Sequence, residues 1–243
     1  MSERNRTRLY DAIAGLCFSI ALITAFVMLY VLVVYPAISR RANEIAMLAA
    51  ITAYAQDVSQ LSQAEIDMHL YRAYRHNAEL ALLPRNHQLM IAEWANVPED
   101  YTDILNIGGT IARLEIASIG VNLPVLHGTG PESMMNGVGH LEGTAFPIGG
   151  YSTHSVLMTH SGKRTAPLFS RLHELDIGDT FVIYVLDRRL VYEVDHIIAI
   201  LPYEIEHLRV VPDADMVTLI TCTPILVNTH RLLVRGVRCP AHG

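Results

Sequence analysis

The stretch DMVTLITCTP at residues 215–224, with NTHRLLVR behind it at residues 228–235, decides the fold of this chain. The first part is apolar and rich in β-branched residues, so it predicts a strand that carries Cys222 to its C-terminal edge, where Pro224 ends it. The second part predicts a strand that returns past Arg231. We therefore expect Cys222 and Arg231 to lie side by side on neighbouring strands.

Cys222 is a candidate nucleophile in this setting. The thiolate is the reactive form of cysteine, and nearby positive charge lowers the pKa of a thiol. Arg231 supplies charge, but it is too basic to exchange a proton near neutral pH. Histidine can do so, and the best placed of the twelve is His160, which closes the apolar run HSVLMTH at residues 154–160 before a glycine turn. Three strand ends would then present the three side chains together.

Each of these residues also has a simpler interpretation when it is taken alone. A free cysteine is most often a small buried hydrophobe, and a histidine on an apolar strand is most often a satisfied core or surface residue. Arg231 could be one end of a surface ion pair of little energetic value. The joint spacing of the three residues favours a catalytic site over these alternatives.

These motifs resemble the signature of the sortases, the cysteine transpeptidases of Gram-positive cell surfaces. Together with GVGHLEGT at residues 137–144, they resemble class C, the pilin-polymerising branch, over about residues 103–238. The resemblance implies Cys222 as nucleophile, His160 as acid and base, and Arg231 as stabiliser of the substrate carbonyl. It implies pilin or surface proteins with LPxTG-like sorting signals as substrates, and a pilin lysine or a cell-wall peptide amine as acceptor. It implies no cofactor and no metal.

Short strand-like runs separated by glycine indicate a mainly β fold, either a barrel or a sandwich. The resemblance selects a sortase-type barrel with about eight strands. A single helical turn is expected at residues 167–172. The runs that predict strands lie at residues 111–116, 121–126, 155–159, 180–186, 190–200, 217–221 and 232–237.

The N-terminal part predicts a membrane anchor. Residues 12–34 carry no charge, and this length spans a bilayer core of ~30 Å at ~1.5 Å per residue. Three arginines precede the apolar run, although Arg40 and Arg41 follow it and weaken the charge asymmetry. A cleaved signal peptide is the alternative, but the run is longer than the usual apolar region of such peptides. We expect one pass through the cell membrane, with the catalytic domain outside the cell.

Two helices are expected after Pro36, at residues 42–61 and 64–83, as a stalk and buttress against the catalytic domain. The expected division of the chain is a cytoplasmic tail at 1–11, a transmembrane signal anchor at 12–35, a helical stalk with a lid-like segment at 36–106, and the catalytic barrel at 107–243.

Several other site types fit the sequence poorly. A net charge of −6 without a basic run argues against nucleic acid as a partner. The glycine-rich residues 128–150 lack the Gly-Lys-Ser/Thr ending of a phosphate loop and an immediately following helix. His127, His140, His154 and His160 match no short zinc motif and are expected to be scattered barrel residues. Glu142 is either structural or part of the substrate groove.

The three cysteines do not suggest a disulfide framework. Cys17 lies in the predicted membrane segment and Cys239 in the C-terminal tail, so neither is an obvious structural partner for the proposed nucleophile. A bridge between Cys222 and Cys239 stays open at this point.

One departure from class C concerns the lid, an Asp-Pro-aromatic motif ahead of the barrel. Residues 98–101 read PEDY, which has the ingredients in another order, so an altered or missing lid and an accessible thiol are expected. The competing functions are a housekeeping-type sortase that anchors proteins to the wall, an L,D-transpeptidase-like crosslinker, and an inactive membrane-anchored scaffold. The crosslinkers usually place Ser-His-Gly before the cysteine, where this chain has Leu-Ile-Thr.

Overall fold

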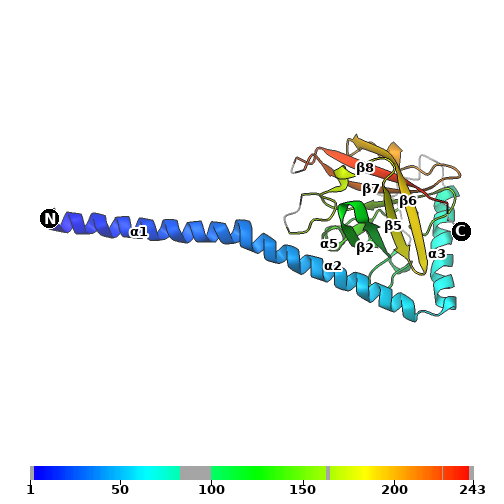
Figure 1. The fold of residues 1–243 in the computed structure, drawn as a ribbon, viewed down its shortest axis with the longest axis horizontal. Helices are drawn as coiled ribbons and strands as arrows, with labels where there is room; N and C mark the ends of the chain where they lie inside the picture. The colour runs from blue at the N-terminus through cyan, green and yellow to red at the C-terminus, as the bar shows by residue number, and fades with distance from the viewer. Residues whose placement is uncertain (1–2, 83–99, 163–164, 226, 241–243) are drawn as a thin grey trace.

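The computed structural model describes residues 3–82, 100–162, 165–225 and 227–240, and shows a long helical rod that ends in a compact barrel (Figure 1). The helical elements are α1 (Glu3–Leu29), η1 (Tyr30–Val34), α2 (Tyr35–Gln60), α3 (Gln63–Leu82), η2 (Tyr101–Asp103), η3 (Ala117–Ile119), α5 (Pro131–Asn136), η4 (Leu172–Glu174) and η5 (Ile205–Leu208). The strands are β1 (Ala112–Ile116), β2 (Val121–His127), β3 (Val138–His140), β4 (Thr153–Met158), β5 (Thr180–Val185), β6 (Arg188–Ile200), β7 (Asp215–Thr223) and β8 (His230–Arg238).

The rod consists of α1, the π-helical turn η1 and α2 in direct succession. Helix α2 starts at Tyr35, seven residues before the expected start at residue 42. Pro36 does not interrupt the rod because it lies in the first turn of α2, directly after the wider π turn, in which the N–H of Tyr35 bonds to the oxygen of Tyr30. The helical run Ile13–Gln60 is long and apolar enough to cross a membrane, and none of its most apolar stretch is buried. The N-terminal rod could therefore anchor the protein in a membrane.

Eight strands close into a barrel in the order β1-β2-β3-β4-β7-β8-β6-β5. The pairs β2–β3 and β4–β7 are parallel, and the other pairs are antiparallel. All seven predicted runs became strands, and the expected eight-stranded barrel is confirmed. The strand that the sequence did not reveal is β3, which has only three residues. The helical turn expected at 167–172 lies further along the chain, at η4.

The barrel interior is filled by large apolar side chains from alternating strand positions. Phe181 and Tyr192 are fully buried, and their rings stack with centroids 5.5 Å apart. Gly236 of β8 faces this pair, and a Cβ atom there would lie 2.6 Å from the Phe181 ring. Only glycine fits at this position of β8, because a methyl group at that distance would displace a buried ring.

Both stalk helices are fixed to the barrel by buried hydrogen bonds. The Tyr54 hydroxyl of α2 donates to the oxygen of Ile111 at 3.1 Å and accepts from the N–H of Leu186 at 2.8 Å. Asn77 of α3 bonds both ways with the backbone of Phe146, at 3.0 and 2.7 Å. Since an unpaired buried polar group costs about 1–3 kcal/mol, these pairs fix the helices in one position. The expected packing of two helices against the barrel is confirmed.

Candidate active site

Cys222 and Arg231 are directly paired across two neighbouring strands. Cys222 is the second-last residue of β7, Arg231 is the second residue of β8, and the antiparallel register sets them opposite each other. Directly opposite residues have Cβ atoms about 4.5–5.5 Å apart and point to the same face of a sheet. The thiol and the guanidinium therefore start from neighbouring positions at one rim of the barrel, as the sequence predicted.

His160 follows β4, the strand on the other side of β7. The parallel β4–β7 register ends with Met158 opposite Ile220. Two further hydrogen bonds extend the pairing: the N–H of Thr159 donates to the oxygen of Ile220 at 3.2 Å, and the Thr221 hydroxyl donates to the oxygen of Thr159 at 2.9 Å. Continued by one residue, this register brings His160 level with the cysteine.

The residue after His160 is tied to the cysteine itself. The Ser161 hydroxyl donates to the main-chain oxygen of Cys222 at 2.6 Å. The N–H of Phe169 donates to the oxygen of His160 at 3.2 Å, so the following loop folds back over the strand end. The structure thus brings all three predicted site residues to the same rim, at the ends of three strands that are neighbours in the barrel.

A cavity of about 290 Å³ opens beside the thiol. The loop after β4 forms one wall, and the start of the β7–β8 turn forms another. Cys222 is half-buried at this cavity, which suits a nucleophile that must meet a substrate. The lining residues are Ser161, Phe169, Ser170, His173, Thr221, Cys222, Thr223, Pro224, Ile225 and Leu232.

His173 in this wall was not predicted from the sequence. It belongs to η4 and reaches the cavity because the loop turns back, with the N–H of Gly162 bonded to the Ser170 hydroxyl at 3.0 Å. No spacing signal links a residue 49 positions before the cysteine to its cavity. Only the folded loop reveals it.

Arg231 is held by the turn that precedes it. Its Nη1 donates to the main-chain oxygens of Asn228 and His230, both at 3.2 Å. Within the described part of the chain, no carboxylate lies in salt-bridge range of its guanidinium. The alternative of a surface ion pair therefore has no support among these residues, and a guanidinium has further N–H groups that can meet a substrate oxygen.

His140 and His154 are both buried and hydrogen-bonded. His154 shares the outer face of the barrel with Val156 and Thr218, where the segment after η5 covers it. The Nε2–H of His140 donates to the oxygen of Ala145 at 3.0 Å, and its Nδ1 accepts from the Tyr101 hydroxyl at 2.8 Å. Burial lowers the pKa of His140 to about 3 and that of His154 to about 4. Both rings are therefore neutral at pH 7 and stabilise the barrel by their hydrogen bonds.

His127 is likewise bonded to the backbone, through Nε2 and the oxygen of Ile104 at 2.8 Å. Among the residues with described positions, no group of three His, Cys, Asp or Glu side chains could hold a metal ion. Glu142 contacts the loop at Gly128 and Thr129 and is not one of the residues that line the cavity at Cys222.

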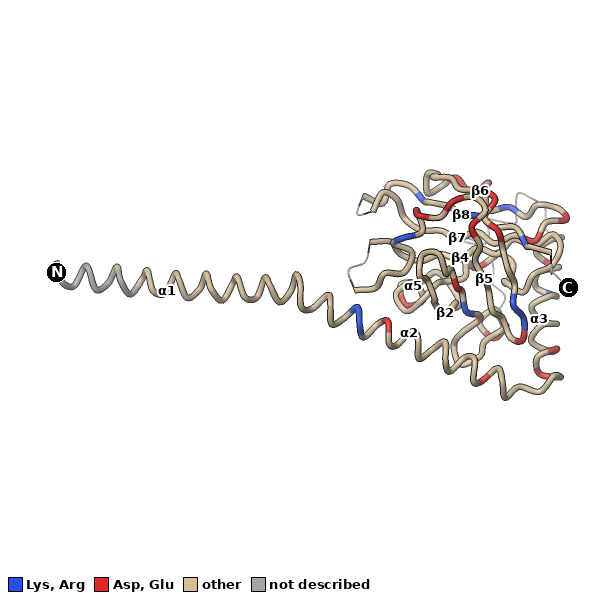
Figure 2. Tube along the Cα trace, in the orientation of Figure 1, with Lys and Arg blue, Asp and Glu red and all other residues tan. Residues whose placement is uncertain are grey.

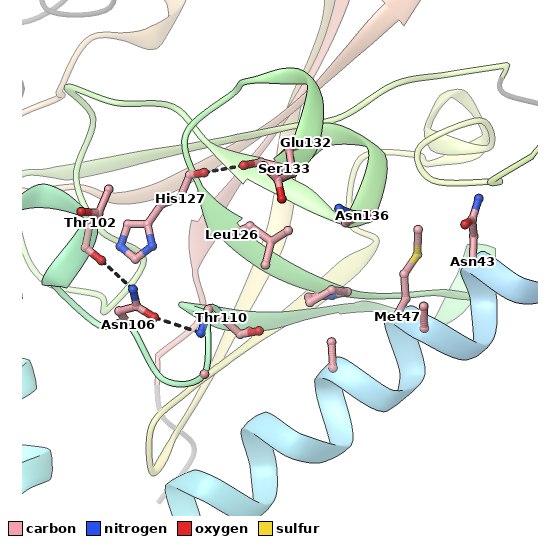
Figure 3. Close-up of a pocket in the computed structure, with 15 residues that line it drawn as sticks. Asn43, Met47, Thr102, Asn106, Thr110, Leu126, His127, Glu132, Ser133 and Asn136 are labelled. Atoms are coloured by element: carbon pink, nitrogen blue, oxygen red, sulfur yellow. Dashed lines mark hydrogen bonds between the residues drawn. The ribbon is translucent and has the colours of Figure 1, made fainter.

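A larger cavity of about 480 Å³ lies elsewhere, between α2 and the barrel (Figure 3). Asn43 and Met47 of α2 form one side, and His127 and Ser133 lie on the other, with the Ser133 hydroxyl bonded to the oxygen of His127 at 2.6 Å. None of the three predicted site residues lines this space. It lies at the junction of the stalk and the barrel and is distinct from the site at Cys222.

Two remaining sequence expectations concern the lid and the tail. Residues 83–99, where a lid would lie, fall outside the described residues. Tyr101 of the PEDY sequence is buried in the core against His140. The three cysteines are free, and Cys239 stands eight positions beyond Arg231, about 26 Å along a strand at ~3.3 Å per residue. The open possibility of a bridge from Cys222 to Cys239 is therefore excluded.

Comparisons with known proteins agree with this geometry. The family model of the sortase domain matches residues 114–239. The solved structure of sortase C1 from pilus island 1 of group B Streptococcus is 39% identical, with a TM-score of 0.73, and the match covers 80% of this chain and 92% of that chain. Sortase C-1 of Actinomyces oris is 42% identical, with a TM-score of 0.66, and the match covers 73% and 99%. Sortase C-1 of Streptococcus pneumoniae is 38% identical, with a TM-score of 0.71, and the match covers 79% and 98%. A search of curated protein sequences found no match.

Proposed function

This chain belongs to the sortase family, is closely similar to solved class C sortases and is a cysteine transpeptidase, and from this premise we propose that it polymerises pilins. The substrate would be a pilin with an LPxTG-like sorting signal, and the acceptor would be a lysine amine of a second pilin. The observation that carries the proposal is the convergence of Cys222, His160 and Arg231 at the ends of three neighbouring strands. Two similar structures, both of group B Streptococcus, are a sortase of a pilus island and a pilus-related sortase, which supports the choice of substrate.

In the proposed first step, the thiolate of Cys222 attacks the threonine carbonyl of the sorting signal. The carbonyl oxygen gains negative charge, and the guanidinium of Arg231 donates hydrogen bonds to it. The tetrahedral intermediate collapses, the bond from carbon to nitrogen breaks, and His160 gives a proton to the departing amine. The products are a thioester on Cys222 and a released peptide that begins with glycine.

In the proposed second step, the lysine amine attacks the thioester carbonyl. Neutral His160 takes the proton from the attacking nitrogen, and the thiolate leaves as an amide forms. The enzyme returns to its starting state, so no oxidant, reductant or metal enters the balance. Water in place of the amine would give hydrolysis instead, so exclusion of water from the thioester decides between the two outcomes.

We also propose the division of the chain that the sequence suggested. Residues 1–11 would lie in the cytoplasm and 12–35 would cross the membrane. Residues 36–106 would form the stalk and lid-like segment, and 107–243 the extracellular catalytic domain. The continuous apolar helix at the N-terminus supports this arrangement.

The test incubates the enzyme with a sorting-signal peptide and identifies the acylated residue by mass spectrometry of proteolytic fragments. We expect a thioester at Cys222 and at no other cysteine, and at least a ~10³-fold loss of peptide cleavage in the Cys222→Ala variant. Circular dichroism of this variant should match that of the original enzyme. Peptide cleavage that persists after the substitution would refute the role of Cys222.

The acceptor is tested in the same assay. A lysine-containing pilin peptide and a cell-wall peptide amine are offered in competition, and the ligated product is identified by mass. Preference for the pilin lysine supports polymerisation, whereas preference for the wall peptide would assign the chain to wall anchoring.

A further inference from the structure

The turn between β7 and β8 has an apolar tip. Residues 224–227 read PILV, whereas turns at a protein surface are usually built from Gly, Pro, Asn, Asp and Ser. Ile225 is 41% exposed and Val227 is 63% exposed. Exposed apolar residues close together in one turn, such as Ile225 and Val227, disfavour solubility and indicate a contact surface.

The backbone of this turn is bonded within the turn. The N–H groups of Val227 and Asn228 both donate to the oxygen of Pro224, at 3.1 and 2.9 Å. Two of the backbone N–H groups of the turn are thus satisfied without water, which lowers the cost of placing the turn against a lipid interface.

The turn lies at the end of the barrel that faces the N-terminal rod. Figure 1 shows the β7–β8 turn and the loop after β4 at the side nearest α1, with α3 at the opposite side. A hydrogen bond fixes this end to the stalk: Nδ2 of Asn43 in α2 donates to the oxygen of Thr165 at 2.9 Å. The catalytic rim thus faces along the rod toward its apolar segment.

The height of this rim above the apolar segment matches the headgroup layer. Ile38 is the last exposed apolar residue before Arg40 and Arg41, and Asn43 follows it by five residues, or about 8 Å along a helix at ~1.5 Å per residue. The headgroup layer is about 5–8 Å thick, from a bilayer of ~40–45 Å with a core of ~30 Å. Spanning helices also tilt by about 20° on average, which brings one side of the barrel closer to the lipid.

The two arginines reinforce this placement. Arg40 and Arg41 lie in α2 and are the first charged residues after the uncharged part of the rod. Figure 2 shows basic residues in blue near the start of α2, beyond the long tan part of the rod. At this height their guanidinium groups can meet lipid phosphates, which basic residues beside a membrane segment attract.

We propose that the tip of the β7–β8 turn, through Ile225 and Val227, docks on the bilayer that holds α1. The occupant of this surface is the lipid interface itself, and the catalytic rim then faces the membrane and meets substrates that are still held in it. The inference rests on the proposed membrane anchor and is independent of which amine the enzyme accepts.

The test uses the full-length chain in vesicles of equal parts phosphatidylcholine and phosphatidylglycerol, with and without bromine on the acyl chains. Tryptophan is introduced by Val227→Trp in a Trp94→Phe background, since Trp94 is the only native tryptophan. The matched control is Tyr151→Trp in the same background, because Tyr151 is 85% exposed and precedes β4 at the opposite rim. We expect brominated lipid to quench the V227W emission at least about twofold and to leave the Y151W emission unchanged.

Equal quenching of the two variants, or none in V227W, would overturn the proposal, whether or not the enzyme cleaves any peptide. Turnover of a tethered and a soluble substrate provides a second test. Val227→Asp should lower turnover of a membrane-tethered sorting substrate about tenfold and leave cleavage of the same soluble peptide unchanged. An equal loss on both substrates would assign the turn to peptide binding instead and refute the membrane role.

Discussion

The two ends of β4 place histidines in opposite settings. His154, near the start of the strand, is fully buried: its Nδ1–H donates to the oxygen of Arg209 at 2.9 Å, and its Nε2 accepts from the Thr218 hydroxyl at 2.7 Å. His160, just past the end of the strand, is half-buried at the open rim beside Cys222. The same residue type is therefore buried and hydrogen-bonded at one end of the strand and half-buried at the rim at the other end, where the proposed role is proton transfer. Cover by the segment after η5 distinguishes the two positions.

Removal of the imidazole at the rim should have the largest effect and tests the contrast between the two histidines most directly. His160→Asn should lower peptide turnover about 10²–10⁴-fold, because the leaving amine loses its proton donor. The free energy of unfolding should change by less than about 1 kcal/mol, since the residue lies outside the core. Turnover from single-turnover kinetics and stability from urea unfolding, measured on one preparation, test both statements. A variant that unfolds readily would place His160 among the structural histidines.

The guanidinium at the same rim should have the next largest effect. Arg231→Lys keeps the charge but loses the forked donor geometry, so turnover should fall about 10²–10³-fold. Because the interaction forms with the developing oxyanion, the loss should appear in kcat and leave KM nearly unchanged. A change confined to KM would instead make Arg231 a substrate-binding residue.

At the buried end of β4, a substitution should reduce stability more than turnover. His154→Leu leaves the Thr218 hydroxyl and the Arg209 oxygen without their partner, so it should destabilise the fold by about 2–4 kcal/mol. Turnover per folded molecule should stay within about threefold of the original enzyme. Urea unfolding, combined with active-site titration by a thiol reagent, separates the two quantities. A large loss of turnover in fully folded protein would contradict the comparison.

The smallest effect is a pH dependence of stability that arises from the buried rings. The pKa of His154 falls from its ordinary 6.5 to about 4 on folding, and that of His140 falls to about 3, in both cases through burial. Below pH 6.5 the two rings bind protons in the unfolded chain, whereas in the folded chain they stay neutral. Their contribution to the free energy of unfolding is therefore full above pH 6.5 and declines as the pH falls below it. Between pH 7 and pH 5 each ring should lower the free energy of unfolding by about 2 kcal/mol, at ~1.4 kcal/mol per pH unit.

Urea unfolding at pH 7 and pH 5 measures this decline. The His154→Leu variant should show a smaller pH effect than the original enzyme by the contribution of one ring. An unchanged pH effect in this variant would show that His154 does not contribute to the acid sensitivity.

The sequence predicted the parts of the fold whose residue pattern is strong. The apolar runs at β7 and β8 predicted two adjacent strands, and the uncharged N-terminal run predicted an apolar helix long enough to cross a membrane. Strand β3 was missed because its three residues, Val138–His140, lie in a glycine-rich stretch, where alternation has too few positions to show. Its pairing depends on close approach, since a Cβ on Gly139 would lie 2.3 Å from the oxygen of Gly128.

Of the candidate site, the sequence predicted only the residues at the ends of strands. Cys222, His160 and Arg231 each follow or begin an apolar run, which is a local signal. His173 and the wall of the cavity depend on a loop that folds back over His160, and the anchoring of α2 by Tyr54 depends on contacts with Ile111 and Leu186, far along the chain. Tertiary contacts of this kind leave no periodic pattern in the sequence.

The parallel pairing of β4 with β7 determines when, during folding, the proposed site residues come together. Met158 and Ile220 are partners although 62 positions separate them, and parallel pairs over such spans form late because chain entropy opposes them. In a nascent chain that has not yet closed its barrel, Cys222 would still be apart from His160. On the proposed roles, the chain is therefore inactive until β4 and β7 have paired. The strand topology alone keeps an unfolded chain inactive, without a separate inhibitor.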